Sequence, residues 1–165
     1  FALAKEEDAH ADVQDIVDSL IFRLKNNPAE AAIPAHIAAL SHCQLSGPCS
    51  LQDMDALALI TAPIENPSMS PSAKGEVLKM AAEYAIARAN DWTLAQTMVE
   101  EALNHSDVPS TRIVYAQVLR NRGDFQGSRL QLEVAKRMDG FGRYTSAIER
   151  ENLLLKQSTS EEKAQ

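Results

Sequence analysis

Long apolar segments are missing from this chain of 165 residues. A helix needs about 20 apolar residues to cross a bilayer. The best candidate, residues 29–40, is short and is interrupted by Glu30, Pro34 and His36. No signal peptide is visible, but the chain begins with Phe1 rather than Met, so we expect a fragment or a processed product. Membrane attachment of a parent chain therefore stays open.

Basic and aromatic residues are also scarce. The formal net charge is −7, which argues against the basic footprint expected of general nucleic-acid binding. Aromatic residues make up 5 % of the chain and apolar residues 45 %, with alanine and leucine supplying the bulk. This composition favours close contacts between helices over a β-sandwich. The sequence predicts an all-α protein with a packed core.

Catalytic motifs are missing as well. The sequence contains no G-x-S-x-G, no glycine-rich phosphate loop and no H-E-x-x-H. Glu100 and Glu101 are neighbouring carboxylates, but adjacent positions on a helix point in different directions and do not converge on a substrate. We therefore expect no enzymatic activity, no catalytic residue, no cofactor and no metal site.

The charge that is present is unevenly distributed. Residues 1–110 carry 6 Lys and Arg against 16 Asp and Glu, whereas residues 112–150 carry 8 against 4. This asymmetry is either an ordinary property of a solvated surface or a basic surface that faces an anionic partner or an acidic part of the same protein.

Two segments that begin 33 residues apart repeat one pattern. Each has an aromatic residue after a turn, a small residue three positions on, an aliphatic residue four further and an alanine three beyond. The matching pairs are Trp92 and Phe125, Ala95 and Ser128, Val99 and Leu132, and Ala102 and Ala135. A period of this length is typical of stacked helix pairs, which bury their apolar faces against one another.

Turn residues and apolar spacing predict one domain over residues 1–165, with a proline-rich connector at 61–72. Its expected parts are irregular front helices at 10–62, helix-pair repeats at 71–105 and 110–138, a capping helix at 143–157 and a disordered tail at 158–165.

The repeats resemble the tetratricopeptide repeat. The second copy matches best, at Tyr115, Ala116, Leu119, Gly123, Phe125, Leu132 and Ala135. The first copy matches at Trp92, Ala95 and Ala102. The pattern departs from the family at Glu83, Ser128 and Gly140. The resemblance implies a right-handed α-α superhelix, with irregular N-terminal helices and a C-terminal capping helix in this chain.

In this family the first helices of the pairs build the inner, concave wall. Carried onto this chain, the resemblance implies a binding groove formed by Tyr84, Arg88, Gln117, Arg120 and Asn121. Arg88 and Arg120 lie nearly one period apart, and arginine binds carboxylates and phosphates in bidentate fashion. The alternative is that these arginines are ordinary solvated residues, some of them paired with Glu83 or Asp124.

Cys43 and Cys49, the two cysteines of the chain, flank a turn that contains Gly47 and Pro48. A single disulfide in an oxidising compartment is the first interpretation, and so short a loop would stabilise the fold by about 2 kcal/mol. Two free buried thiols are an alternative. A metal site with nearby histidines is another, although its spacing is poor for tetrahedral zinc.

A weaker resemblance concerns the layout of the chain. Two cysteines, a proline-bearing connector and then repeats are similar to the tetratricopeptide-containing C-terminal domains of bacterial membrane glycosyltransferases and surface-polysaccharide polymerases. We expect a non-catalytic interaction module of a bacterial envelope protein, periplasmic or extracytoplasmic. Its expected partner is a protein or peptide, or an anionic glycan or lipid-linked carrier. The alternatives are an accessory domain that handles acceptor or polymer for such an enzyme, and a cytoplasmic adaptor.

Overall fold

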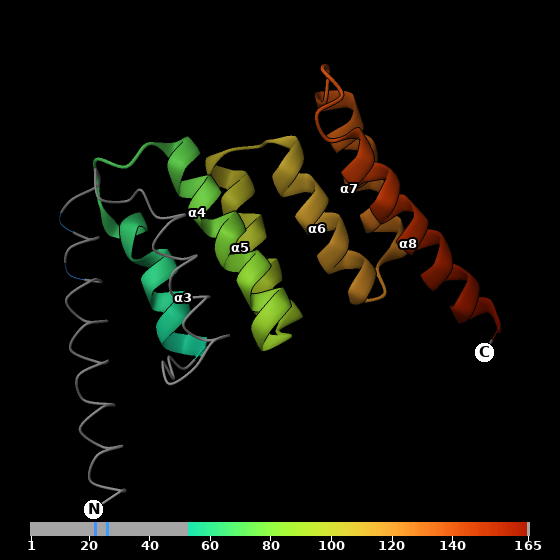
Figure 1. The fold of residues 1–165 in the computed structure, drawn as a ribbon, viewed down its shortest axis with the longest axis horizontal. Coiled ribbons are helices and arrows are strands. Elements are labelled where there is room, and N and C mark those ends of the chain that lie inside the picture. The colour runs from blue at the N-terminus through green and yellow to red at the C-terminus, as the bar shows by residue number, and fades with distance from the viewer. Residues whose placement is uncertain (1–21, 23–25, 27–52, 165) are drawn as a thin grey trace, which may run out of the picture. The chain divides into compact units, whose positions relative to one another are not determined.

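The computed structural model describes residues 22, 26 and 53–164 of the chain (Figure 1). Within this part every secondary-structure element is a helix and no strand occurs, which confirms the all-α prediction. The predicted disulfide between Cys43 and Cys49 and most of the predicted front helices lie outside the described residues.

The chain divides into two compact units, residues 1–70 and 71–165. The boundary between the two units falls at the end of the predicted connector. Pro63, Pro67 and Pro71 lie in this connector. Proline removes a backbone donor and disfavours helix in the residue before it, so no continuous helix can run through the segment.

The first unit contains α3 (Asp53–Thr61) and the short 3₁₀ helix η2 (Ala62–Glu65). Leu57, Leu59 and Ile60 are buried on α3. The Thr61 hydroxyl donates to the Leu57 carbonyl at 2.9 Å, and a proline at the start of η2 ends the α-helical hydrogen-bond pattern. α3 lies within the segment 10–62 for which the sequence predicts irregular front helices.

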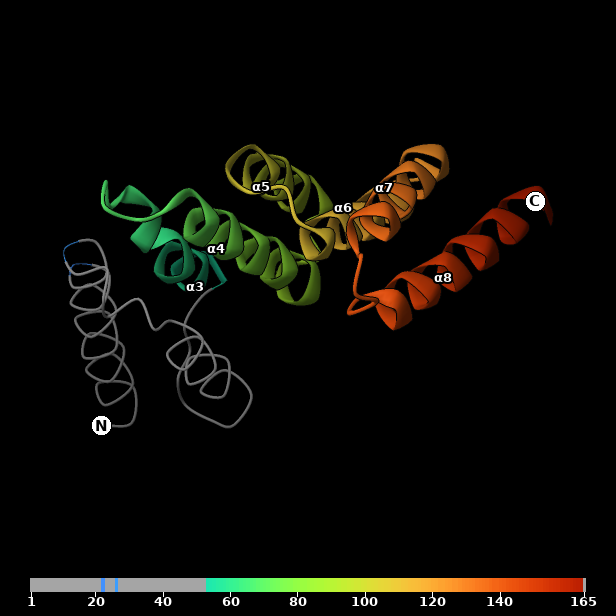
Figure 2. The same ribbon diagram turned by 90° about the horizontal axis from the view of Figure 1, so that it is seen from above.

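The second unit contains five α-helices. They are α4 (Pro71–Tyr84), α5 (Trp92–His105), α6 (Pro109–Asn121), α7 (Phe125–Met138) and α8 (Thr145–Ala164), with a π-helical turn, η3 (Ala85–Ala89), after α4. Each helix packs against the next, and α6 also contacts α4 and α8. Figure 2 shows α4, α6 and α8 in one layer and α5 and α7 in a second.

The starts and ends of these helices follow from local chemistry. The Asp91 carboxylate accepts from the backbone N–H groups of Thr93 and Leu94, at 3.1 and 2.9 Å, and caps α5. Asp124 caps α7 in the same way, accepting from Gly127 N at 2.8 Å. Gly123, with a φ of +84°, makes the turn between α6 and α7 that most side chains would resist.

Two apolar clusters form the core of the second unit. The first joins α4 and η3 to α5 and α6 through Ala82, Ala85, Ala95, Val99, Val114 and Val118. The second joins α6, α7 and α8 through Ala116, Leu132, Ala135, Ile148 and Leu155. Many of these residues are alanines with no exposed surface. Because alanine has a short side chain, the helix backbones can approach closely.

The last helix extends further than the sequence predicted. We expected a helix at 143–157 and a disordered tail, but α8 continues to Ala164. The Ser158 and Ser160 hydroxyls donate to the carbonyls of Leu154 and Lys156, at 3.1 and 2.9 Å. These bonds let the polar side chains pair with the helix backbone. Residues 145–164 contain no glycine or proline that would end the helix.

Ser128 offers a test of core packing. It is fully buried on α7, and its hydroxyl has no hydrogen-bond partner among the described residues. We expect Ser128→Ala to raise the free energy of unfolding by about 1 kcal/mol, because the unsatisfied hydroxyl is removed and alanine favours helix. Urea unfolding would measure the change.

Thr111 provides a second case for that measurement, because its hydroxyl is also buried and without a partner among these residues. Thr111→Val should also raise the free energy of unfolding, since valine keeps the shape of threonine without the hydroxyl. A loss of stability in both variants would contradict the prediction and show that the hydroxyls are hydrogen-bonded.

Candidate binding surface

The five residues of the predicted groove lie on helices of one layer. Tyr84 is the last residue of α4, and Arg88 lies in η3 directly after it. Gln117, Arg120 and Asn121 lie in the last two turns of α6. Both helices belong to the layer that also contains α8 (Figure 2).

Arg120 forms an ion pair with the last helix. Its Nε donates to Glu151 Oε1 at 2.5 Å, and the two side chains are only 13 % and 9 % exposed. Glu151 lies on α8 between the buried Ile148 and Leu155. The pair therefore joins α6 to α8 inside the protein, and Arg120 positions a helix instead of standing free as a cation.

Arg88, in contrast, is exposed. It lies in the turn η3, which ends at Asn90 in a left-handed conformation with a φ of +49°. The backbone N–H of Asp91 reaches back to the carbonyl of Ala85 at 3.1 Å and closes the widened turn. π-Helical turns are rare and occur frequently at functional sites. Tyr84, before this turn, is partly buried and interacts with the surrounding protein.

Gln117 and Asn121 form a local pair. Asn121 Nδ2 donates to the Gln117 backbone carbonyl at 2.8 Å. Ile113, Gln117 and Arg120 follow the spacing of one helix side, and all three keep part of their surface exposed. This side of α6 therefore presents an apolar residue, a side-chain amide and the partly exposed guanidinium of Arg120.

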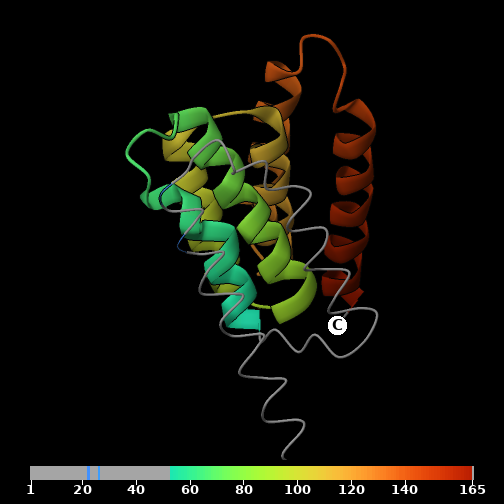
Figure 3. The same cartoon turned by 60° about the vertical axis from the view of Figure 1, so that its left-hand side comes forward.

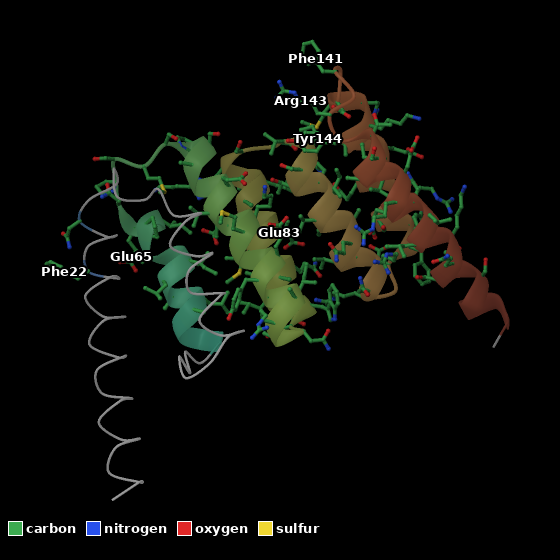
Figure 4. All side chains as sticks on the ribbon, in the orientation of Figure 1. Phe22, Glu65, Glu83, Phe141, Arg143 and Tyr144 are labelled. Carbon is green, nitrogen blue, oxygen red and sulfur yellow. The ribbon has the colours of Figure 1, made fainter. Side chains whose placement is uncertain are left out.

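The neighbouring α4 is acidic on one side. Glu76 and Glu83 lie two turns apart, and Lys79 Nζ contacts Glu76 Oε1 at 2.6 Å. Glu83 is an exposed residue of α4 (Figure 4), and partial desolvation of its carboxyl group raises its pKa. Lys79 opposes this increase and Glu76 adds to it. Because α4 carries carboxylates close to Arg88, the layer of α4, α6 and α8 has mixed charge.

A polar cluster links α5 to α6. The Tyr115 hydroxyl donates to Glu100 Oε1 at 2.6 Å, and Gln96 Nε2 donates to the same oxygen at 2.8 Å. Partial burial is the largest cause that raises the pKa of Tyr115, and the bond to Glu100 is the second. Together they bring this pKa to about 12. The bonds from Tyr115 and Gln96 lower the pKa of Glu100. At neutral pH the phenol is protonated and the carboxylate ionised, so the cluster joins the two helices.

Arg112 holds the loop before α6. Its Nε and Nη2 donate to the two oxygens of Asp107, at 2.8 and 2.6 Å, and its Nη1 donates to Gln131 Oε1 on α7 at 2.6 Å. The bonds from Arg112 lower the pKa of Asp107. This guanidinium is therefore used to connect the α5–α6 loop, α6 and α7.

Comparison with known proteins does not assign this chain to a family. No protein-family model, curated protein sequence or solved structure matches this chain. The function must therefore be inferred from the residues themselves.

Metal ligation and membrane spanning have no candidates in the part of the chain that the structure describes. No group of three or more His, Cys, Asp or Glu residues is placed there to hold a metal ion. None of the helices described is both long and apolar enough to cross a bilayer. The alternative metal site with Cys43 and Cys49 falls outside this part.

Sequence reasoning missed the partners of the arginines. Glu151 carried a usable signal, because it interrupts the apolar stripe formed by Ile148 and Leu155, and a charge in such a stripe predicts a buried partner. The bond between Tyr115 and Glu100 had no comparable signal, since it depends on how α5 and α6 pack. The same holds for the bidentate pair of Asp107 and Arg112, which depends on the path of a loop.

Proposed function

We propose that residues 71–164 form a tetratricopeptide-like, right-handed superhelix that acts as a non-catalytic binding module for a peptide. The observation that carries this proposal is the contact of α6 with both α4 and α8 in a single layer. Stacked helix pairs that repeat in this way curve and create an extended concave surface for binding. The period of 33 residues between the two repeats supports the same interpretation.

The proposed binding wall is the layer of α4, α6 and α8. Arg88 supplies an exposed cation that can bind a carboxylate in bidentate fashion. Gln117 and Asn121 supply side-chain amides for the peptide backbone. Because Glu83 lies close to Arg88 in the sequence and on the same layer, a peptide with both acidic and basic residues suits the wall better than a uniformly anionic polymer.

Arg120 and Glu151 have a supporting role in this proposal. Their ion pair holds α8 against α6, so the wall keeps its third helix without a ligand. A wall that is ordered in advance binds more tightly, because less conformational entropy is lost on binding.

Arg88→Glu tests the proposal. Peptides would be selected from a random displayed library against the full chain, and their affinities measured by fluorescence anisotropy. We expect Arg88→Glu to weaken the selected peptides about tenfold, because an attractive charge becomes a repulsive one. The loss should be greatest at low salt, where screening is weakest.

Arg129→Glu is the matched control. Arg129 is exposed like Arg88, but it lies on α7, in the other layer. The same change of charge there should leave affinity within about twofold at physiological salt, since Arg129 lies outside the proposed wall and makes no direct contact with a peptide bound to it. Equal losses in the two variants, or no peptide selected at all, would contradict the proposed wall.

A further inference from the structure

The loop between α7 and α8 displays an aromatic side chain to solvent. Phe141 is 94 % exposed and projects from the tip of this loop (Figure 4). The loop stands beyond the ends of the two helices that it joins (Figure 3). Leu130, Met138 and Leu153 of the second unit are also exposed, at 40–57 %, but Phe141 is exposed almost completely and stands among basic residues.

Phe141 is held outward by an ordered loop. The Asp139 carboxylate accepts from the backbone N–H groups of Arg143 and Tyr144, both at 2.8 Å. Gly142 N donates to the Asp139 carbonyl at 3.1 Å, and Gly142 has a φ of +69°. Tyr144 packs against the core cluster of α6, α7 and α8. The base of the loop is therefore held by these hydrogen bonds and by the packing of Tyr144.

Positive charge surrounds the loop. Lys136 and Arg137 lie in the last turn of α7, Arg143 follows Phe141 by two residues, and all three are exposed. Asp139 directs its carboxylate oxygens to backbone N–H groups. Residues 136–143 carry three cations against the single carboxylate of Asp139, so this segment is locally cationic, although the whole chain has a net charge of −7.

We propose that this loop docks on an anionic lipid bilayer. Phe141 inserts at the boundary between headgroups and acyl chains, and Lys136, Arg137 and Arg143 lie among the lipid phosphates. An aromatic residue beside basic residues is the combination that interfacial membrane contacts use. The inference is independent of the peptide-binding wall, because it uses a loop that the wall does not include.

The shape of the loop favours a bilayer over a protein partner. A stable protein interface buries about 800 Å² on each side, whereas this loop offers one fully exposed apolar side chain on a projecting tip. A bilayer accepts such a side chain without a complementary pocket. With a single aromatic residue and three cations the attachment is weak and reversible, as for a single lipid anchor.

Vesicle co-sedimentation with the full chain tests the proposal. We expect binding to vesicles of phosphatidylcholine with about one third phosphatidylglycerol, and at least about tenfold weaker binding to phosphatidylcholine alone. Added salt should weaken the binding, because the lipid charge is screened. Absence of binding to the anionic vesicles, or equal binding to both, overturns the proposal.

Substitutions of Phe141 separate insertion from simple charge attraction. Phe141→Ser should lower the bound fraction about fivefold or more, whereas Leu153→Ser should leave it unchanged, because Leu153 is an exposed apolar residue on α8 away from the loop. Phe141→Trp should retain binding and show a blue shift of its emission on addition of anionic vesicles. Unchanged binding of Phe141→Ser overturns the insertion of this residue.

The charges of the loop are tested in the same assay. Arg137→Glu with Arg143→Glu should reduce binding to anionic vesicles to the level seen with phosphatidylcholine. Arg129→Glu with Arg150→Glu is the matched control, since both residues are exposed and neither lies in the loop. Far-UV circular dichroism would verify that each variant is folded. Equal effects of the two pairs overturn the proposal.

Discussion

Glu151→Ala is expected to lower the free energy of unfolding by about 3–5 kcal/mol. The substitution leaves the Arg120 guanidinium, which is only 13 % exposed, without its carboxylate partner at 2.5 Å. An uncompensated charge inside a protein is costly, because no water replaces the lost partner. Urea unfolding followed by circular dichroism would measure the loss.

A double variant in which both charged residues become apolar tests whether the loss in Glu151→Ala comes from the unpaired charge of Arg120. Arg120→Met with Glu151→Leu should recover most of the lost stability, because apolar residues of similar size remove both charges together. Arg122→Ala, at an exposed position near the same end of α6, should change stability by less than about 0.5 kcal/mol. A loss of less than about 1 kcal/mol in Glu151→Ala would mean that the pair is solvated and contributes little.

The ion pair also connects stability to the proposed function. Because Arg120 joins α6 to α8, its loss should free the last helix before the rest of the second unit unfolds. Amide hydrogen exchange would then increase in α8 more than in α5, which lies in the other layer. Peptide binding at Arg88 would be retained by the apolar double variant if α8 stays in place.

Local chemistry explains why much of the fold was predictable. The repeated pattern of the sequence begins at Trp92 and Phe125, and these are the first residues of α5 and α7. In both cases an aspartate cap and a glycine or asparagine turn precede an apolar stripe, and these signals lie within a few residues of one another. The all-α class follows from the same periodicity.

Features that depend on packing between distant residues were not predictable in the same way. Arg120 and Glu151 are 31 residues apart, and their meeting depends on the register of α8 against α6. The predicted groove contains both Arg88 and Arg120 because both residues match helix positions of the repeat family. Those positions say nothing about an ion pair with another helix. The sequence predicts an end of the last helix at residue 157 because the following residues are polar, but polar residues are compatible with an exposed helix, and α8 continues to Ala164.

Gly75→Ala is the second substitution with a large expected effect. A Cβ atom at Gly75 would lie 2.8 Å from Ser106 Cβ and 3.1 Å from the Ala102 carbonyl oxygen. Both neighbours belong to the C-terminal end of α5 and its cap, so α4 would have to move away from α5. We expect overpacking to cost about 1–3 kcal/mol, against a gain in helix propensity of about 1 kcal/mol. Gly75→Leu should be worse, because no space exists for a longer side chain.

Two other glycines separate packing from backbone conformation. A Cβ atom at Gly140 would have no neighbour within 4 Å, and Gly140→Ala should leave stability within about 0.5 kcal/mol. Gly123 has open space as well but a φ of +84°, so Gly123→Ala should cost about 1 kcal/mol through strain alone. Ser106→Gly should partly rescue Gly75→Ala and do nothing for Gly123→Ala. If Gly75→Ala stabilised the protein by the full helix-propensity gain of about 1 kcal/mol, the added Cβ atom would meet no clash, and α4 and α5 would not be packed as closely as their backbones indicate.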